Sequence, residues 1–213
     1  EYNLKDLLKY AVDTLIQIKN SIYFDNKLHL NKYNSNIFKS EISELSDYYF
    51  PYMGIYDDNL KEEFISIWLE EYKNLNFEFS YFVHKDFNIN NLILIPSNKH
   101  HLKCGVIDFQ SSFWGESSWD LFSLLEDSRV LFSDKFNDFF IRYFYERSNQ
   151  THSLREFKNN YYFLNSSRQT RLLGRWVKLA NEFKEDFYLN FISVTKKRLF
   201  KSMNNINNKK LKN

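Results

Sequence analysis

The chain has 213 residues, of which 43% are hydrophobic and 19% aromatic, so it is too apolar for intrinsic disorder and long enough to bury a core. Its formal net charge is +2, which excludes the strong positive field of a typical nucleic-acid-binding domain. No apolar run reaches the roughly 20 residues of a membrane span, and one cysteine excludes an internal disulfide framework. We expect a globular cytoplasmic chain with no nucleic-acid or membrane partner.

The N-terminal part of the chain is predicted to contain two amphipathic helices. Apolar residues at helical spacing run from Leu4 to Ile18 and again over about 59–74. Asp57 or Asp58 can cap the second helix, and its inward-facing residues are expected to be Leu60, Phe64, Ile67, Trp68 and Tyr72. Residues 21–56 are rich in Asn, Ser and Tyr, which predicts a loop with room for one short helix.

The middle of the chain changes to short apolar runs of strand length, at 77–83, 92–95 and 102–107. Residues 96–101 are predicted to be the turn between the second and third runs. We therefore expect a small sheet whose strands bracket two polar loops.

Helical periodicity returns in the C-terminal part. Ser117 or Ser118 can cap a helix that runs through Arg129, Ser133 a helix to about Glu146, and Ser153 with Glu156 forms a capping box. Two further helices are predicted around 166–183 and 186–202. The expected organisation is one helical α+β body over 1–203 and a frayed polar tail over 204–213.

Three polar residues in the middle segment match the needs of phosphoryl transfer. That reaction requires one carboxylate to orient the attacking hydroxyl and oxygen ligands that hold Mg²⁺ against the phosphates of ATP. Asp86 on the first loop is predicted to be the catalytic carboxylate, with Asn91 and Asp108 as metal ligands. Each alone has a simpler reading as a turn or capping residue, but a short hairpin between Asn91 and Asp108 places these two side by side.

Neighbouring residues are assigned supporting roles. His84 is expected to fasten the loop through hydrogen bonds. Lys85 faces either the phosphates of the nucleotide or solvent, and Asp120 either offsets a helix dipole or accepts amide hydrogens from the catalytic loop. Candidate substrate contacts are Glu41 and Asp47 for sugar hydroxyls and Arg168 and Arg171 for an anionic group, although surface residues of these types often have no such role.

Together the motifs resemble those of the aminoglycoside phosphotransferase family, which has a protein-kinase-like fold. The residues concerned are His84-Lys85-Asp86 with Asn91, Val106-Ile107-Asp108-Phe109-Gln110, Gly115 and Trp119-Asp120-Leu121. Within the family the pattern is most similar to that of bacterial N-acetylmuramate/N-acetylglucosamine anomeric kinases. The resemblance implies Asp86 as catalytic base, Asn91 and Asp108 as Mg²⁺ ligands, Asp120 as the loop-bracing acid, and ATP as phosphate donor.

The sequence departs from the family pattern in two ways. The chain has four glycines and no glycine-rich phosphate loop, so we expect it to be the C-terminal lobe of a two-lobed kinase whose nucleotide-binding lobe lies upstream. Ser111 also replaces an acidic residue found in the amino-sugar branch. The expected activity is phosphate transfer to a hydroxyl of a small molecule, most simply an amino sugar. Choline, an aminoglycoside or another metabolite, or a non-catalytic binding role, remain alternatives.

Overall fold

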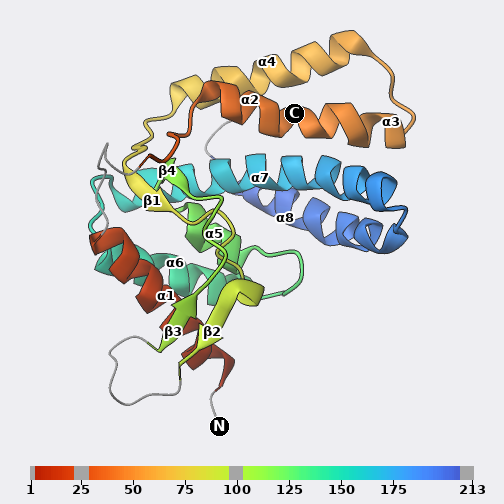
Figure 1. Ribbon diagram of the computed structural model, residues 1–213. Coiled ribbons are helices and arrows are strands. Elements are labelled where there is room, and N and C mark those ends of the chain that lie inside the picture. Colours follow the sequence, from red (N-terminus) through yellow and green to blue (C-terminus); the bar gives the residue numbers. More distant parts are fainter. Residues whose placement is uncertain (1–2, 22–28, 96–102, 207–213) are drawn as a thin grey trace. The chain divides into compact units, whose positions relative to one another are not determined.

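The computed structural model describes residues 3–21, 29–95 and 103–206 (Figure 1). The turn predicted at 96–101 and residues 207–213 of the predicted tail lie outside these ranges. The described part of the chain is mainly helical with two small antiparallel sheets, which confirms the expected α+β class. No helix in these ranges is both long and apolar enough to cross a membrane.

The chain forms two compact units, and each unit is assembled from two separate segments. The first unit comprises Glu1–Tyr33 and Phe77–Lys158, and the second comprises Asn34–Asn76 and Asn159–Asn213. All the motif residues from His84 to Asp120 belong to the first unit. The candidate substrate residues belong to the second unit, namely Glu41, Asp47, Arg168 and Arg171.

Three helices build most of the first unit. Helix α1 (Leu4–Ser21) forms where the apolar periodicity predicted it and buries Leu8, Val12 and Leu15. Helix α5 (Trp119–Leu125) is shorter than predicted, because the chain leaves helical geometry at Glu126 rather than after Arg129. Helix α6 (Asp134–Arg147) begins where predicted, with the Ser133 hydroxyl accepting the Phe136 amide at 3.3 Å.

Four short strands form two separate sheets instead of the single small sheet expected. Strand β1 (Tyr81–Val83) pairs antiparallel with β4 (Phe113–Gly115), and β2 (Leu92–Leu94) pairs antiparallel with β3 (Cys104–Val106). The sequence did not predict β4, whose three residues are all buried and therefore show no alternation of apolar and polar side chains. The β2–β3 register sets Leu92 opposite Val106, and a 3₁₀ turn, η2 (Ile89–Asn91), leads into β2.

The N-terminal part of the second unit is more helical than predicted. The expected loop contains α2 (Ser35–Glu44), a π-helical turn η1 (Leu45–Tyr49) and α3 (Phe50–Tyr52), which follow one another directly. Helix α4 (Asp58–Asn74) starts at the predicted Asp57 cap, although its first apolar residue, Leu60, is exposed. Aromatic packing explains α2, since Phe38 stacks on Tyr72 with ring centroids 4.5 Å apart.

The C-terminal helices also differ from the prediction. The Ser153–Glu156 capping box is present, but the helix it starts, α7 (Leu154–Phe183), continues through the region where a new helix was expected. Its buried Asn165 bonds Ser202 at 2.6 Å on α8 (Ile192–Asn205), which follows a 3₁₀ segment, η3 (Asp186–Phe191). The tail prediction was wrong for residues 204–206, because α8 extends to Asn205 and Ile206 is buried.

Gly174 permits a close approach between two helical segments of the second unit. A Cβ atom built on it would lie 2.0 Å from the Glu44 carbonyl oxygen, which is backbone and cannot rotate away. We expect Gly174→Ala to lower the free energy of unfolding by about 1–3 kcal/mol, despite the higher helix propensity of alanine.

Urea unfolding of the two proteins measures this difference. Gly105→Ala is the matched control, because its nearest atom would be a side-chain methyl at 3.4 Å. Equal stabilities of Gly174→Ala and the parent protein would contradict the close-approach argument.

Candidate functional site

The loop that carries Asp86 is fixed through its backbone. The Asp86 carbonyl oxygen accepts three hydrogen bonds, from the Asn88 amide at 2.9 Å, the Asn88 side chain at 3.0 Å and the Asn91 side chain at 2.8 Å. Within the described ranges no donor contacts the Asp86 carboxylate. The main chain is thus anchored while the acid group stays available to accept a hydrogen bond from a substrate hydroxyl.

Asn91 and Asp108 lie next to each other, as the hairpin between them predicted. The Ile107 amide donates to the Asn91 carbonyl at 3.0 Å, which aligns the two residues at the end of the β2–β3 ladder. The Asn91 side-chain nitrogen lies 3.5 Å from Asp108 Oδ2, and the side-chain nitrogen of Gln110 donates to Asp108 Oδ1. An amide and an exposed carboxylate are thereby placed at one point of the surface.

Two of these loop residues have backbone angles that are unusual for residues other than glycine. Lys85 has φ 76° and Asp108 has φ 72°. Such left-handed conformations cost about 1–3 kcal/mol each and persist where the surrounding contacts determine them. Their occurrence in both motif loops marks these loops as shaped by something other than local preference.

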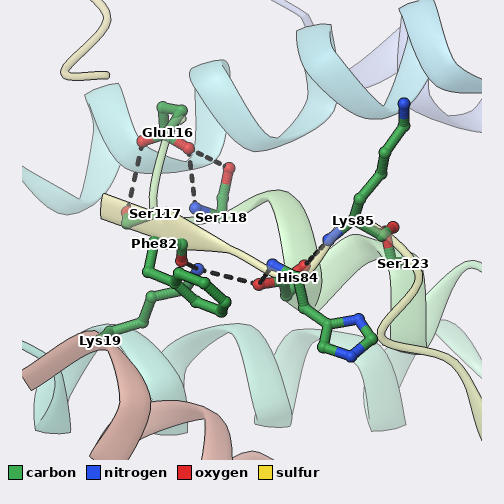
Figure 2. A network of polar contacts seen from close by, with 9 residues as sticks. Lys19, Phe82, His84, Lys85, Glu116, Ser117, Ser118 and Ser123 are labelled. Atoms are coloured by element: carbon green, nitrogen blue, oxygen red, sulfur yellow. Dashed lines mark hydrogen bonds and ion pairs between the residues drawn. The ribbon is translucent and has the colours of Figure 1, made fainter. Parts of the chain in front are cut away.

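Asp120 accepts two hydrogen bonds from the loop that carries Asp86, and the donor residues His84 and Lys85 are labelled in Figure 2. Its carboxylate oxygens lie 2.9 Å from the His84 amide and 3.0 Å from the Lys85 amide. The Ser123 hydroxyl, on the same helix α5, donates to the Lys85 carbonyl at 3.3 Å. Both peptide groups that flank the strained Lys85 are therefore held by α5.

The sequence did not predict the partner of Asp120, which is Lys19 on α1. Its Nζ lies 2.9 Å from Asp120 Oδ2, and the two side chains are 1% and 0% exposed. Lys19 also donates to the carbonyl of Phe82 on β1, as Figure 2 shows. No local signal identifies this residue, because it lies 101 positions from Asp120 on a helix with two other lysines.

His84 connects the two motif loops. Its buried ring places Nε2 3.0 Å from the Ile107 carbonyl, one residue before Asp108. Because a carbonyl can only accept, Nε2 carries the proton in this contact. Figure 2 shows the His84 ring and the Lys85 side chain leaving the loop in opposite directions, and the Lys85 ammonium lies 6.0 Å from the centre of the Phe113 ring.

Glu41, Asp47 and Arg171, which are candidate substrate residues of the second unit, take part in ion pairs. Arg171 on α7 pairs with Glu41 on α2 at 2.7 Å, with the two side chains 13% and 15% exposed. Asp47 pairs with Lys61 at 2.6 Å on the surface, and Arg168 lies half-buried one turn before Arg171. The structure thus brings Glu41 and Arg171 together and places Asp47 in a separate pair.

An apolar cavity of about 190 Å³ lies between α1 and the β2–β3 hairpin. Its lining is aliphatic for the most part and includes Leu8, Ile89 and Ile93, while Asp86 and Asp108 do not contribute to it. Within the described ranges no three His, Cys, Asp or Glu residues converge on a metal position. Asn91 and Asp108, the predicted metal ligands, offer one side-chain amide oxygen and one carboxylate.

Comparison with known proteins agrees with the geometry of this site. Residues 56–157, which include all four of Asp86, Asn91, Asp108 and Asp120, match the sequence profile of the phosphotransferase enzyme family. The resemblance to that family expected from the motifs is therefore confirmed.

A curated relative is the N-acetylmuramate/N-acetylglucosamine kinase of Caulobacter vibrioides. It is 29% identical over 112 residues, which are 52% of this chain but 30% of that protein. The match thus concerns about half of this chain and less than a third of the relative.

Glu116 offers a test of the buried polar cluster beside this site. Burial raises the pKa of its carboxyl, while hydrogen bonds from the Ser118 hydroxyl and amide and the charges of His152 and Lys19 lower it. Because the folded protein holds this proton more tightly than the unfolded chain, stability is fully present below the ordinary glutamate pKa and falls as pH rises through the raised pKa. Glu116→Gln should abolish that fall.

The free energy of urea unfolding, measured from pH 4 to pH 8 for both proteins, tests this expectation. The variant should gain stability relative to the parent as pH rises. Glu156→Gln is a control of opposite sign, since hydrogen bonds from Ser153 lower the pKa of the exposed Glu156. A difference between Glu116→Gln and the parent that does not change with pH would contradict the raised pKa.

Proposed function

We propose that the protein containing this chain transfers the γ-phosphate of ATP to a hydroxyl of an amino sugar of the N-acetylmuramate or N-acetylglucosamine type. The family match supports a phosphotransferase of the kinase type, and the relative supports the acceptor class. The observation that carries the proposal is the position of Asp86, whose backbone is fixed by three hydrogen bonds while its carboxylate remains available.

Each polar residue has a defined task in this proposal. Asp86 accepts a hydrogen bond from the acceptor hydroxyl and aligns it for attack. Asn91 and Asp108 supply a neutral oxygen and a carboxylate, which are the hard ligands that Mg²⁺ prefers. The two side chains lie beside each other, with Asn91 Nδ2 3.5 Å from Asp108 Oδ2. When bound, the metal neutralises charge on the phosphates. Lys85 is proposed to face the phosphates of the nucleotide. An N-terminal lobe is proposed to complete the nucleotide-binding site.

Residues of the second unit are proposed to contact the acceptor. Glu41 and Arg171 form a partly buried pair, in which each charge fixes the orientation of the other. A carboxylate held in this way accepts hydrogen bonds from sugar hydroxyls, whereas the guanidinium suits an anionic group such as a lactyl carboxylate. Asp47, which pairs with Lys61, and Arg168 are also proposed to contact the acceptor. The cytoplasm, where ATP is available, is the proposed location.

A second candidate function is ligand binding without turnover. It is favoured by one observation, namely that the matched region amounts to only 30% of the kinase relative. This alternative predicts that the chain by itself binds ATP weakly or not at all. Phosphate transfer by the full-length protein separates the two functions, because only the first predicts a phosphorylated product.

Substitution of Asp86 tests the catalytic assignment. We expect Asp86→Ala to lower kcat by about 10²–10⁴-fold with the fold intact, since a positioned general base contributes about that factor. Phosphate transfer from labelled ATP and the circular dichroism spectrum are the two measurements. Asp138→Asn, on the surface of α6, is the control and should leave kcat unchanged. Turnover by Asp86→Ala close to that of the parent would refute the role.

Substitution of Asp108 tests the metal assignment separately. Asp108→Asn removes the carboxylate but keeps the side-chain shape, so Mg²⁺-dependent transfer should be lost together with binding of Mn²⁺. Electron paramagnetic resonance of Mn²⁺ in the presence of ATP measures the binding without any need for turnover. Unchanged Mn²⁺ affinity in the variant would exclude Asp108 as a ligand.

A panel of acceptors tests the substrate class. Transfer should occur to N-acetylmuramate or N-acetylglucosamine and be at least about tenfold slower with choline or an aminoglycoside, because differences in hydrogen-bonding groups cause large discrimination. Faster transfer to choline or an aminoglycoside would support the kinase activity but contradict the proposed acceptor class. No transfer to any of the four by the full-length protein would favour the binding function.

A further inference from the structure

We infer that Lys19 is a positioning residue that sets the conformation of the catalytic loop by holding Asp120. This inference rests on the proposed function only for its effect on turnover, because its structural part concerns contacts within the first unit. Lys19 does not touch the loop. It acts through the two groups to which it donates, Asp120 and the Phe82 carbonyl.

The charges of the Lys19–Asp120 pair are buried. Both the ammonium of Lys19 and the carboxylate of Asp120 are removed from solvent, with side chains 1% and 0% exposed. A charge buried in this way costs several kcal/mol unless a partner and further hydrogen bonds compensate it. Asp120 obtains that compensation from Lys19 and from the His84 and Lys85 amides. Its carboxylate therefore cannot rotate without leaving one of these groups unpaired.

Lys85 is the strained residue of this loop. Lys85 adopts φ 76°, which its neighbours must impose because the residue has no intrinsic preference for it. The imposing contacts on its amide side come from Asp120, at 2.9 Å and 3.0 Å. Since Asp86 follows Lys85 directly, the torsion of Lys85 decides where the Asp86 carboxylate lies.

Lys19 also contacts the strand that leads into the loop. Lys19 donates to the carbonyl of Phe82 on β1, two residues before the first amide that Asp120 accepts. One ammonium thus ties the strand that enters the loop to the acid that holds the loop, and α1 carries it. Ser123 adds a bond to the Lys85 carbonyl but no charge, so it cannot replace Lys19.

The test uses Lys19→Met, which keeps most of the side-chain volume and removes the charge. The exchange of the His84 and Lys85 amide hydrogens, followed by NMR, should become about tenfold faster or more, while the amides of Phe140 and Phe144 in the core of α6 keep their protection. Lys9→Met, which breaks the exposed Lys9–Asp13 pair on the same helix, is the matched control and should change neither.

Turnover supplies a second readout. If the loop is displaced, kcat should fall about tenfold while KM for ATP changes by less than about twofold, since misplacing a catalytic group affects the transition state more than binding. Absence of transfer in the parent protein would refute the proposed function and leave the exchange result to decide the role of Lys19.

For a folded Lys19→Met protein, three outcomes overturn the inference. They are unchanged exchange at His84 and Lys85 in Lys19→Met, a uniform rise that includes Phe140 and Phe144, and a kcat equal to that of the parent in an active protein. If Lys19→Met does not fold, Lys19→Met/Asp120→Asn removes both buried charges and is measured in the same way. The double variant should show the same local loss of protection, and its failure to fold would assign Lys19 to general stability.

Discussion

The buried ion pair between Lys19 and Asp120 is the interaction on which the arrangement of the candidate site depends. Because neither charge reaches solvent, every hydrogen-bonding position around them must be filled, and the groups that fill them come from α1, β1, the loop that carries Asp86 and α5. Such a pair adds little net stability compared with apolar packing. Its effect is to leave one relative placement of these four elements that satisfies all partners.

The chemistry proposed for the site follows from that placement. The loop offers Asp86 with its main chain fixed and its carboxylate available, and the β2–β3 hairpin sets Asp108 beside Asn91. Two residues in unfavourable left-handed conformations, Lys85 and Asp108, lie in the two motif loops. The rest of the first unit compensates their cost, which is typical of a site organised for binding or catalysis.

The sequence predicted what local patterns encode and missed what distant contacts decide. Helix starts at Asp57, Ser133 and Ser153 were predictable, because a capping side chain and its amide are three residues apart or less. The continuous α7 was not, since its polar segment is stabilised by contacts such as that of Asn165 with Ser202. Lys19 was not predictable for the same reason, because its partner Asp120 lies 101 positions away in the sequence. The adjacency of Asn91 and Asp108 was predictable because a single hairpin joins them.

The division of each unit between two stretches of chain has a consequence for how the protein is made. During synthesis the first unit is complete once Lys158 has left the ribosome, whereas the first segment of the second unit, Asn34–Asn76, must wait for its partner from Asn159 onward. Until then the aromatic face of α2 and α4, with Phe38 and Tyr72, lacks the Phe163 ring that later covers it. Apolar surface that is uncovered during synthesis favours contacts with other chains, so this waiting period favours aggregation.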